Sequence, residues 1–443
     1  MEATLQEILD ARENRVVRQR ALLAEYQKPL ISFTMNIPGP VKLDRDVVIG
    51  FFVGCRLIRD SLAGHLLFAE EHRRNTGCEA FYVADLPVRE LKQLALDIED
   101  ADSVGRLFDI DVLDTDGKKL SREDMGIPRR KCLLCNEDAA VCASVRAHSL
   151  EELTDRTHFL LYLAARQYMA EYVAVRAYLA LTLEVSATPK PGLVDRNNSG
   201  AHKDMTIRHF FASANALRPF FCRFAETGYL TRDLMPSETF GKIRDLGKEA
   251  ERAMLAATRG VNTHKGAIFS LGLLCAAAGR LGPDHWQPET ILAEAAAMTA
   301  GLVASELAGI TKDAAQTTGE RLYATYGITG IRGQAEAGFP AVQNVGLSIL
   351  RQALEKGLSF NDALCITLLH LLPVTEDTNF IHRSNPKKWK DTQREIREFL
   401  QTDPFPSLEA ILELDRRFIG ENLSPGGTAD LLAVTCFLYL LGG

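Results

Sequence analysis

The spacing of apolar residues changes about one third of the way along the chain. Up to about residue 140, segments with helical periodicity alternate with short apolar runs that are typical of strands. Helices are predicted over residues 4–25, 44–74 and 88–99, and strands over residues 30–35, 80–84 and 105–114. This interleaving predicts an α+β domain with a small mixed sheet, which we place at residues 1–153.

Beyond about residue 150 the pattern is helical throughout. Long amphipathic or apolar segments alternate with polar, glycine-bearing loops, and no internal repeat keeps a fixed period. Helices are predicted over residues 159–183, 208–224, 291–307, 345–355 and 361–372. The second domain is therefore predicted to be an all-α helical bundle that covers residues 157–443.

The most apolar of these segments, residues 267–279, carries no charge and follows the polar sequence GVNTHKG. It is shorter than the ~20 residues needed to cross a bilayer, which favours a helix buried inside a folded domain. With Asn262 or Thr263 as N-cap, the free amides of the first turn lie next to His264 and Lys265. Such a helix start can hold a phosphate, although an ordinary capped core helix has the same pattern.

Composition and charge narrow the class of protein. The 443 residues carry a net charge of -7, so we expect no basic field that binds nucleic acid. The charged, amphipathic N-terminal sequence is not typical of a signal peptide, and no segment is predicted to cross a membrane. Most of the nine cysteines are single residues in apolar runs, which is typical of reduced thiols. We therefore expect a cytoplasmic protein that acts on small molecules.

Two carboxylates lie two residues apart in the predicted strand at 108–112, FDIDV. Asp109 and Asp111 would point to the same face and could share one Mg²⁺ that bridges a polyphosphate. Such an ion would neutralise a departing pyrophosphate, and Arg106, expected on the same face, could contact a phosphate oxygen. The pattern also allows two exposed acids on the polar face of an edge strand.

A cluster of sulfur and imidazole ligands follows this strand. Cys132, Cys135, Cys142 and His148 fall within ~17 residues and could form a Cys₃His zinc site that stabilises a loop with little other core. The spacing after the first pair is looser than in common zinc ribbons. Reduced cysteines without a metal are therefore an open alternative, and a catalytic cysteine is a weaker one.

Polar loops interrupt the helical part of the chain at five places. Each alone is typical of turns and helix caps, but together they could converge on one polar site at an end of the bundle. None contains a Walker A sequence or a GxGxxG fingerprint. The loops lie at residues 188–205, 260–266, 330–340, 374–383 and 424–430.

Longer motifs resemble two known families. SFTMNIPGPVK at 32–42, GRLFDIDV at 105–112 and the cysteine-containing region at 130–153 resemble apo-citrate lyase phosphoribosyl-dephospho-CoA transferase. TPKPGLVD at 188–195, GVNTHKGAIF at 260–269 and EDTN at 376–379 are similar to triphosphoribosyl-dephospho-CoA synthase. The resemblance covers nearly the whole chain. It implies a bifunctional fusion whose N-terminal domain is nucleotidyltransferase-like.

The resemblance implies two successive reactions. The C-terminal domain would join ATP to 3′-dephospho-CoA with release of adenine. The N-terminal domain would then transfer phosphoribosyl-dephospho-CoA to a serine of the citrate lyase acyl carrier (gamma) subunit, with release of pyrophosphate. In this second step pyrophosphate departs, and a Mg²⁺ ion held by Asp109 and Asp111 is expected to neutralise such a leaving group.

The resemblance also implies roles for residues of the polar loops. Together with Mg²⁺, the residues expected to bind the triphosphate are Lys190, Gly192, Asn262, Thr263, Lys265, Arg332 and Asn379. Metal ligands or a catalytic base are expected among Asp195, Glu336, Glu376, Asp377 and Asp430. Candidates for proton transfer are His202 and His264. Two other functions stay open, namely the equivalent enzyme pair for malonate decarboxylase and a non-catalytic nucleotide- or CoA-binding regulator.

Overall fold

The structure is a computed structural model that describes residues 2–442. The chain forms two compact units, Met1–Met169 and Ala170–Gly443. The elements of the first unit are α1 (Leu5–Tyr26), β1 (Leu30–Met35), α2 (Arg45–Ser61), β2 (Leu66–Arg74), β3 (Gly77–Ala84), α3 (Val88–Asp100), β4 (Phe108–Leu113), β5 (Lys119–Leu120), α4 (Ala139–Val145) and α5 (Leu150–Ala164). The sequence analysis thus correctly predicted a unit that mixes helices with one small sheet.

The sheet has the strand order β2-β3-β1-β4-β5, and every neighbouring pair is antiparallel. It is therefore not the mixed sheet that the sequence predicted. Short turns join β2 to β3 and β4 to β5, and such connections can produce only antiparallel pairs.

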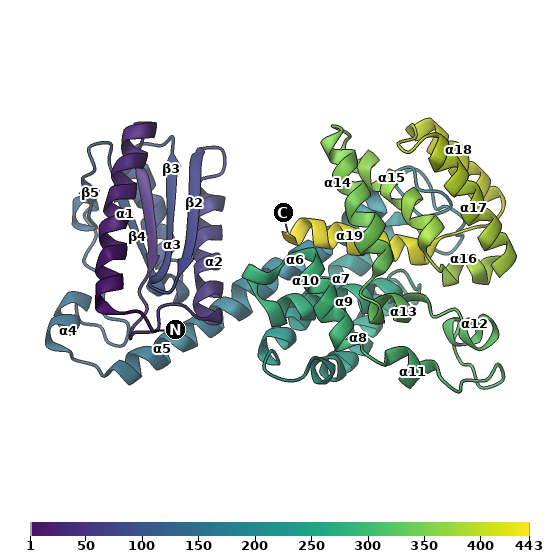
Figure 1. Ribbon diagram of the computed structural model, residues 1–443, viewed down its shortest axis with the longest axis horizontal. Helices are drawn as coiled ribbons and strands as arrows, with labels where there is room; N and C mark the ends of the chain where they lie inside the picture. The colour runs from purple at the N-terminus through teal and green to yellow at the C-terminus, as the bar shows by residue number, and fades with distance from the viewer. Residues whose placement is uncertain (1, 443) are drawn as a thin grey trace. The chain divides into compact units, whose positions relative to one another are not determined.

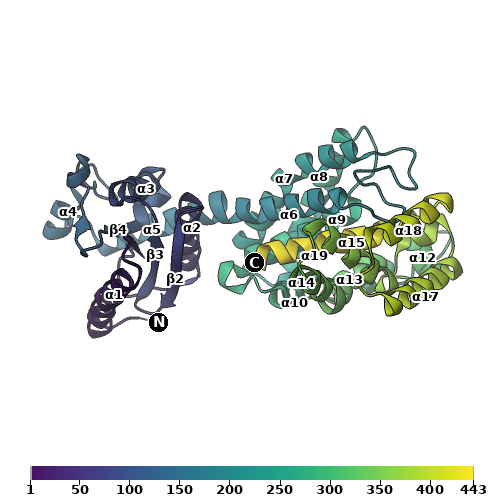
Figure 2. The same ribbon diagram turned by 90° about the horizontal axis from the view of Figure 1, so that it is seen from above.

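The two faces of the sheet have different partners (Figures 1 and 2). Phe108, Ile110 and Val112 point into the larger core, which also contains apolar residues of α2, α3 and α5. The opposite face packs against α1 through a smaller cluster around Leu22 and Phe81. Because side chains alternate along a strand, Asp109 and Asp111 lie on the α1 face.

Two further predictions in this unit were wrong. The helix expected over residues 44–74 ends at Ser61, and residues 66–74 form the edge strand β2. Pairing with β3 overrides local propensity here, and charges are common on edge strands. The strand expected from residue 105 begins at Phe108, because Val104–Leu107 form a 3₁₀ turn. Arg106 is therefore not on the strand face with Asp109.

In the described part of the second unit, every regular element is helical. These helices are α6 (Ala170–Ser186), α7 (Ile207–Leu230), α8 (Pro236–Ala257), α9 (Lys265–Leu281), α10 (Pro288–Met298), α11 (Leu302–Leu307), α12 (Thr318–Tyr326), α13 (Gly330–Glu336), α14 (Leu347–Glu355), α15 (Phe360–Leu371), α16 (Thr378–Arg383), α17 (Pro386–Thr402), α18 (Leu408–Gly420) and α19 (Gly426–Gly442).

Helix α9 is the centre of this unit and contacts α6, α7, α8, α10 and α19 (Figure 1). Its residues from Ala267 to Arg280 are almost all buried, as the charge-free pattern predicted. Glycines allow α7 and α9 to approach closely: a Cβ at Gly228 would lie 2.0 Å from Ala276 O, and one at Gly279 would lie 2.0 Å from Ala225 O. The C-terminal half of α9 is thereby packed tightly against α7.

One segment, Pro288–Leu307, is long and apolar enough to cross a membrane by length and composition. The sequence analysis treated most of it as one helix, residues 291–307. The structure divides it into α10 and α11 at a turn over residues 299–301. Buried residues of α10, including Ile291 and Leu292, face neighbouring helices α8, α9 and α13. The segment thus contributes to the core of the helical unit.

Candidate active sites

The first unit contains a cavity of about 920 Å³, here called the N-terminal cavity. It is lined by residues of α1, β1, β4, the loop at 36–42 and the segment at 130–153. Among the lining residues that the structure describes, Asp109 is the sole acid. The lining has seven basic side chains, namely Arg12, Arg15, Lys42, Arg106, Arg130, Lys131 and Arg146. This excess of positive charge suits a ligand with several phosphate groups.

Asp109 and Asp111 share a strand face, but their surroundings differ. Asp109 lies opposite Thr34 of β1, and both line the cavity. Asp111 lies opposite Ser32, and its carboxylate is 2.5 Å from Lys119 Nζ of β5. Burial raises the pKa of Asp109, and the neighbouring charge of Asp111 adds to this effect. Asp109 is thus the member of the pair that faces the cavity.

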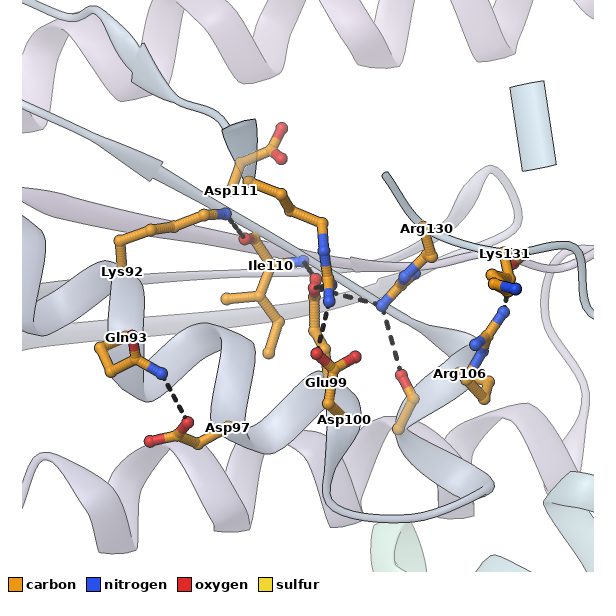
Figure 3. Close-up of polar contacts among 12 residues, drawn as sticks. Lys92, Gln93, Asp97, Glu99, Asp100, Arg106, Ile110, Asp111, Arg130 and Lys131 are labelled. Atoms are coloured by element: carbon orange, nitrogen blue, oxygen red, sulfur yellow. Dashed lines mark hydrogen bonds and ion pairs between the residues drawn. The ribbon is translucent and has the colours of Figure 1, made fainter. Parts of the chain in front are cut away.

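The backbone between these two acids is held by side chains from α3 (Figure 3). Ile110 N donates to Glu99 Oε1 at 2.9 Å, and Lys92 Nζ donates to Ile110 O at 3.4 Å. Glu99 also binds the Arg130 guanidinium at 3.3 Å. Burial raises the pKa of Glu99 and lowers that of Lys92. A single buried network therefore fixes both the acidic strand and one cationic side chain of the cavity.

Arg106 reaches the cavity from its 3₁₀ turn. Its guanidinium donates to Lys131 O (Figure 3) and, at 3.2 Å, to Cys132 O. Arg106 therefore holds the segment that carries the first cysteine of the cluster, as well as lining the cavity.

The four residues of the predicted Cys₃His site come together. One possible ligand atom from each of Cys132, Cys135, Cys142 and His148 lies within 4.8 Å of all the others. Cys135 Sγ is 3.4 Å from both Cys142 Sγ and His148 Nε2. Metal binding by these four residues stays a prediction.

The helical unit contains a second cavity, of about 390 Å³, here called the C-terminal cavity. All five polar loops of the sequence analysis contribute to its lining. Of the predicted residues, those that line it are Lys190, His202, Asn262, Thr263, His264, Lys265, Glu376, Asn379 and Asp430. The expected convergence of loops far apart in sequence is thus present.

The start of α9 faces a carboxylate in this cavity. A Cβ at Gly266 would lie 2.0 Å from Asp430 Oδ2, and the Ala267 amide donates to the Asp430 carboxylate. Burial raises the pKa of Asp430 well above its usual value, and the charges of Glu184 and Asp377 raise it further. The N-cap of α9 is His264, not Asn262 or Thr263, although Asn262 Oδ1 accepts from Lys265 N at 3.2 Å.

A buried ion pair forms part of the same cavity. Lys190 Nζ lies 2.5 Å from Glu184 Oε1, and both residues are almost completely buried. Burial raises the pKa of Glu184 despite the neighbouring lysine. Lys190 therefore carries its charge against a protein carboxylate. Lys265, in contrast, is largely exposed and pairs with Glu251 at 2.6 Å.

The two predicted histidines have different environments. His264 is buried, and its Nδ1 is 2.7 Å from Ser213 Oγ. Burial, with the nearby charge of Lys190, lowers its pKa to about 3. His202 Nδ1 accepts from Arg383, because a guanidinium can only donate, so His202 Nε2 carries the proton and donates to Ser424 Oγ at 2.8 Å. Both imidazoles are therefore neutral near pH 7.

Two buried polar atoms near the start of α9 lack a hydrogen-bond partner in the described part of the chain. They are His264 Nε2 and Thr263 Oγ1. Because buried polar groups are usually satisfied, their presence in the lining of a cavity indicates a ligand position.

Several predicted residues hold loops and do not line the cavity. Asp195 accepts from the amides of Lys190, Asn197 and Asn198. Asp377 caps α16 and also binds Thr428. Arg332 pairs with Glu306.

Glu336 accepts from Gly301 N and Val303 N at the start of α11. Gly192 packs against Leu423 O, where a Cβ would lie only 2.0 Å away. Asp195, Glu336 and Asp430 do not form one ligand set among the described residues.

The sequence analysis missed several residues of both cavities. Glu184 could have been selected from the sequence, because it is the single charged residue in the apolar run ALTLEVSA. Gln334, His382, Arg383 and Ser424 lie within or beside the polar loops but were not selected. Arg12 and Arg15 belong to an ordinary amphipathic helix, and no local pattern distinguishes them from surface charges.

Comparison with known families assigns each unit. Residues 3–162 match the CitX family, apo-citrate lyase phosphoribosyl-dephospho-CoA transferase. Residues 170–443 match the CitG family, ATP:dephospho-CoA triphosphoribosyl transferase. The chain belongs to the CitX–CitG fusion family. It therefore combines two transferase activities in the synthesis of the citrate lyase prosthetic group, which confirms the resemblance seen in the sequence.

Curated relatives share this organisation over their full length. Protein CitXG of Haemophilus influenzae is 36% identical over 457 residues, which cover 99% of this chain and 97% of the relative. Protein CitXG of Leuconostoc mesenteroides subsp. cremoris is 35% identical over 459 residues, with the same coverage. A probable 2-(5''-triphosphoribosyl)-3'-dephosphocoenzyme-A synthase of Pectobacterium carotovorum is 42% identical over 261 residues, 58% of this chain and 85% of the relative.

Proposed function

We propose that the N-terminal cavity is the site of the phosphoribosyl-dephospho-CoA transferase and works by nucleotidyl-transfer chemistry. The observation that supports this is one half-buried acid, Asp109, among seven Lys and Arg side chains. The substrate carries a triphosphate and the pyrophosphate of dephospho-CoA, so its charge complements this lining. The basic residues orient the substrate for attack and stabilise the charge that develops on the leaving pyrophosphate.

The transfer step follows from this placement. The hydroxyl oxygen of a serine on the citrate lyase acyl carrier subunit attacks the phosphorus next to the ribose. A phosphodiester forms, pyrophosphate leaves, and the hydroxyl proton passes to Asp109. The carboxylate of Asp109 lines the cavity, where it can accept this proton.

Asp109 and Asp111 also fit a Mg²⁺ ion, because both carboxylates are on one strand face and oxygen ligands suit this ion. When bound, Mg²⁺ supplies charge neutralisation at the phosphates. Asp111 would have to exchange Lys119 for the ion.

We further propose that the C-terminal cavity is the synthase site. The 2′-hydroxyl of dephospho-CoA attacks C1″ of the ATP ribose, and the bond to adenine breaks. Asp430 accepts the hydroxyl proton, since its carboxyl group lines the cavity in which the substrates meet. The departing adenine takes up one proton, so the reaction as a whole neither releases nor consumes a proton.

His264 assists adenine by hydrogen bonding and not as an imidazolium acid. Its pKa of about 3 keeps the ring neutral. In the tautomer in which Ser213 Oγ donates to Nδ1, the proton lies on Nε2. The unsatisfied Nε2 can then donate to a ring nitrogen of the leaving base. Lys265 and Arg383, which line the same cavity, are placed to bind the triphosphate.

Nine cysteines without a disulfide are consistent with the cytoplasm, where the proposed substrates occur. The full chain should be incubated with ATP and 3′-dephospho-CoA and assayed for free adenine by chromatography. Apo carrier subunits of citrate lyase and of malonate decarboxylase are then added, and each is weighed by mass spectrometry. Adenine release followed by a mass increase on the citrate lyase carrier supports the proposal. Absence of adenine release would contradict it.

A further inference from the structure

The segment between β5 and α5 has almost no apolar core. Between residues 121 and 149, Cys142 alone is buried, and Val141 and Val145 are exposed. Regular structure amounts to an isolated bridge between Lys131 and Asp138, a short 3₁₀ turn and the seven-residue helix α4. A segment of this kind cannot be held in one conformation by hydrophobic burial, and small units without a core usually need a cross-link or a metal.

The one concentrated group of side chains in this segment is the cysteine–histidine cluster. Cys132 and Cys135 come from the loop after Arg130, Cys142 from α4, and His148 from the residues just before α5. Their possible ligand atoms all lie within 4.8 Å of one another. A tetrahedral Zn²⁺ with bonds of ~2.3 Å to sulfur and ~2.0 Å to nitrogen requires ligand atoms ~3.5 to 3.8 Å apart. The 3.4 Å separations at Cys135 differ from this by only a few tenths of an ångström.

We propose that Cys132, Cys135, Cys142 and His148 bind one structural Zn²⁺ ion. Three thiolates and one imidazole form a complete tetrahedral set with no position left for a substrate, which is typical of structural sites. Soft sulfur donors in a tetrahedral arrangement favour zinc over Mg²⁺ or Ca²⁺. Arg106, which donates to Lys131 O and Cys132 O, holds the first ligand loop from outside the metal shell.

The site also defines one wall of the N-terminal cavity. Cys132, Cys142 and His148 line that cavity, and the cationic residues Lys131 and Arg146 lie beside the ligands in sequence. The zinc ion would therefore hold these two side chains in place for the substrate phosphates. This consequence, unlike the metal site itself, rests on the proposed transferase function.

Metal analysis of the purified full-length chain tests the site. The expected result is one Zn²⁺ per chain after gel filtration. Cys135→Ser and His148→Ala should each lower bound zinc at least about tenfold. Cys222→Ser, which removes a thiol from α7 in the other unit, should keep it. Growth with Co²⁺ should give the sulfur-to-cobalt charge-transfer band and the strong d–d bands of a tetrahedral site, and Cys135→Ser should lose both.

Two outcomes would overturn the metal site. One is a metal-free protein whose nine thiols are all reduced, as shown by titration with a thiol reagent in denaturant. The other is a Cys135–Cys142 disulfide found by mass spectrometry. The functional consequence is tested by removing zinc with a chelator, dialysing the chelator away and assaying with added Mg²⁺. This treatment should abolish carrier loading and leave adenine release unchanged. If zinc is present but its removal leaves carrier loading intact, the metal site stands and the placement of transfer in this cavity fails.

Discussion

Gly266 of α9 lies directly against the carboxylate of Asp430 of α19. A Cβ built at Gly266 would be only 2.0 Å from Asp430 Oδ2, and the adjacent Ala267 amide donates to the same carboxylate. Residues 164 positions apart in the sequence thus meet at the start of the most buried helix of the unit. A glycine is required here because any side chain would occupy the position of the proposed base.

The contact between these two residues predicts the effect of Gly266→Ala. The added methyl group should displace the Asp430 carboxylate by an ångström or more, and adenine release should fall by about 10²-fold. Carrier loading from supplied triphosphoribosyl-dephospho-CoA should not change, because it uses the other unit. Gly241→Ala is a matched control: it lies in α8 with no atom within 4 Å of its Cβ position. This control should keep both activities, and equal losses in the two variants would contradict the role of the contact.

The buried pair between Lys190 and Glu184 predicts a non-additive effect on stability. Lys190→Met should lower the free energy of unfolding by about 3–5 kcal/mol, because it leaves Glu184 buried without a partner. The double variant with Glu184→Gln should be more stable than Lys190→Met alone. Urea unfolding followed by tryptophan fluorescence reports this unit selectively, because both tryptophans, Trp286 and Trp389, belong to it. A double variant less stable than Lys190→Met would contradict the pairing.

The buried imidazole of His264 predicts a pH dependence of stability. A histidine in the unfolded chain takes up a proton near pH 6.5, whereas His264 in the folded chain does so near pH 3. Between these values the unfolded state binds more protons, so the free energy of unfolding falls as the pH falls. From pH 7 to pH 5 this contribution should be about 2 kcal/mol, and His264→Gln should lack it. Tryptophan-monitored unfolding at the two pH values checks this, and equal pH slopes for the two proteins would contradict it.

Local pattern was sufficient for the central features of the structure. The charge-free run after Lys265 became the buried helix α9, and the alternation in FDIDV placed Asp109 and Asp111 on one face of β4. These features depend on periodicity over a few residues, which the sequence contains in full. Residues 66–74 were misassigned because their conformation depends on pairing with β3 and not on their own propensity.

The identity of the cavity residues was less predictable. Asp195, Asp377 and Asp430 all lie in the polar loops and all accept from backbone amides, yet of the three it is Asp430 that lines the cavity. Capping and catalysis use the same side chains, so the distinction depends on tertiary contacts that no local pattern contains. The basic lining of the N-terminal cavity was missed for a related reason. Its arginines come from segments as distant as α1 and the C-cap of α4, and their convergence exists only in the folded chain.

The two reactions are assigned to two separate sites in one polypeptide, and a pair of matched variants tests this assignment most directly. Adenine release and carrier mass should be measured for Asp109→Asn and Asp430→Asn, with triphosphoribosyl-dephospho-CoA supplied in the carrier assay. Asp109→Asn should release adenine at the wild-type rate but load the carrier at least about 10²-fold more slowly. Asp430→Asn should load the carrier at the wild-type rate but release adenine at least about 10²-fold more slowly. Loss of both activities in either variant, or full carrier loading by Asp109→Asn, would contradict the assignment.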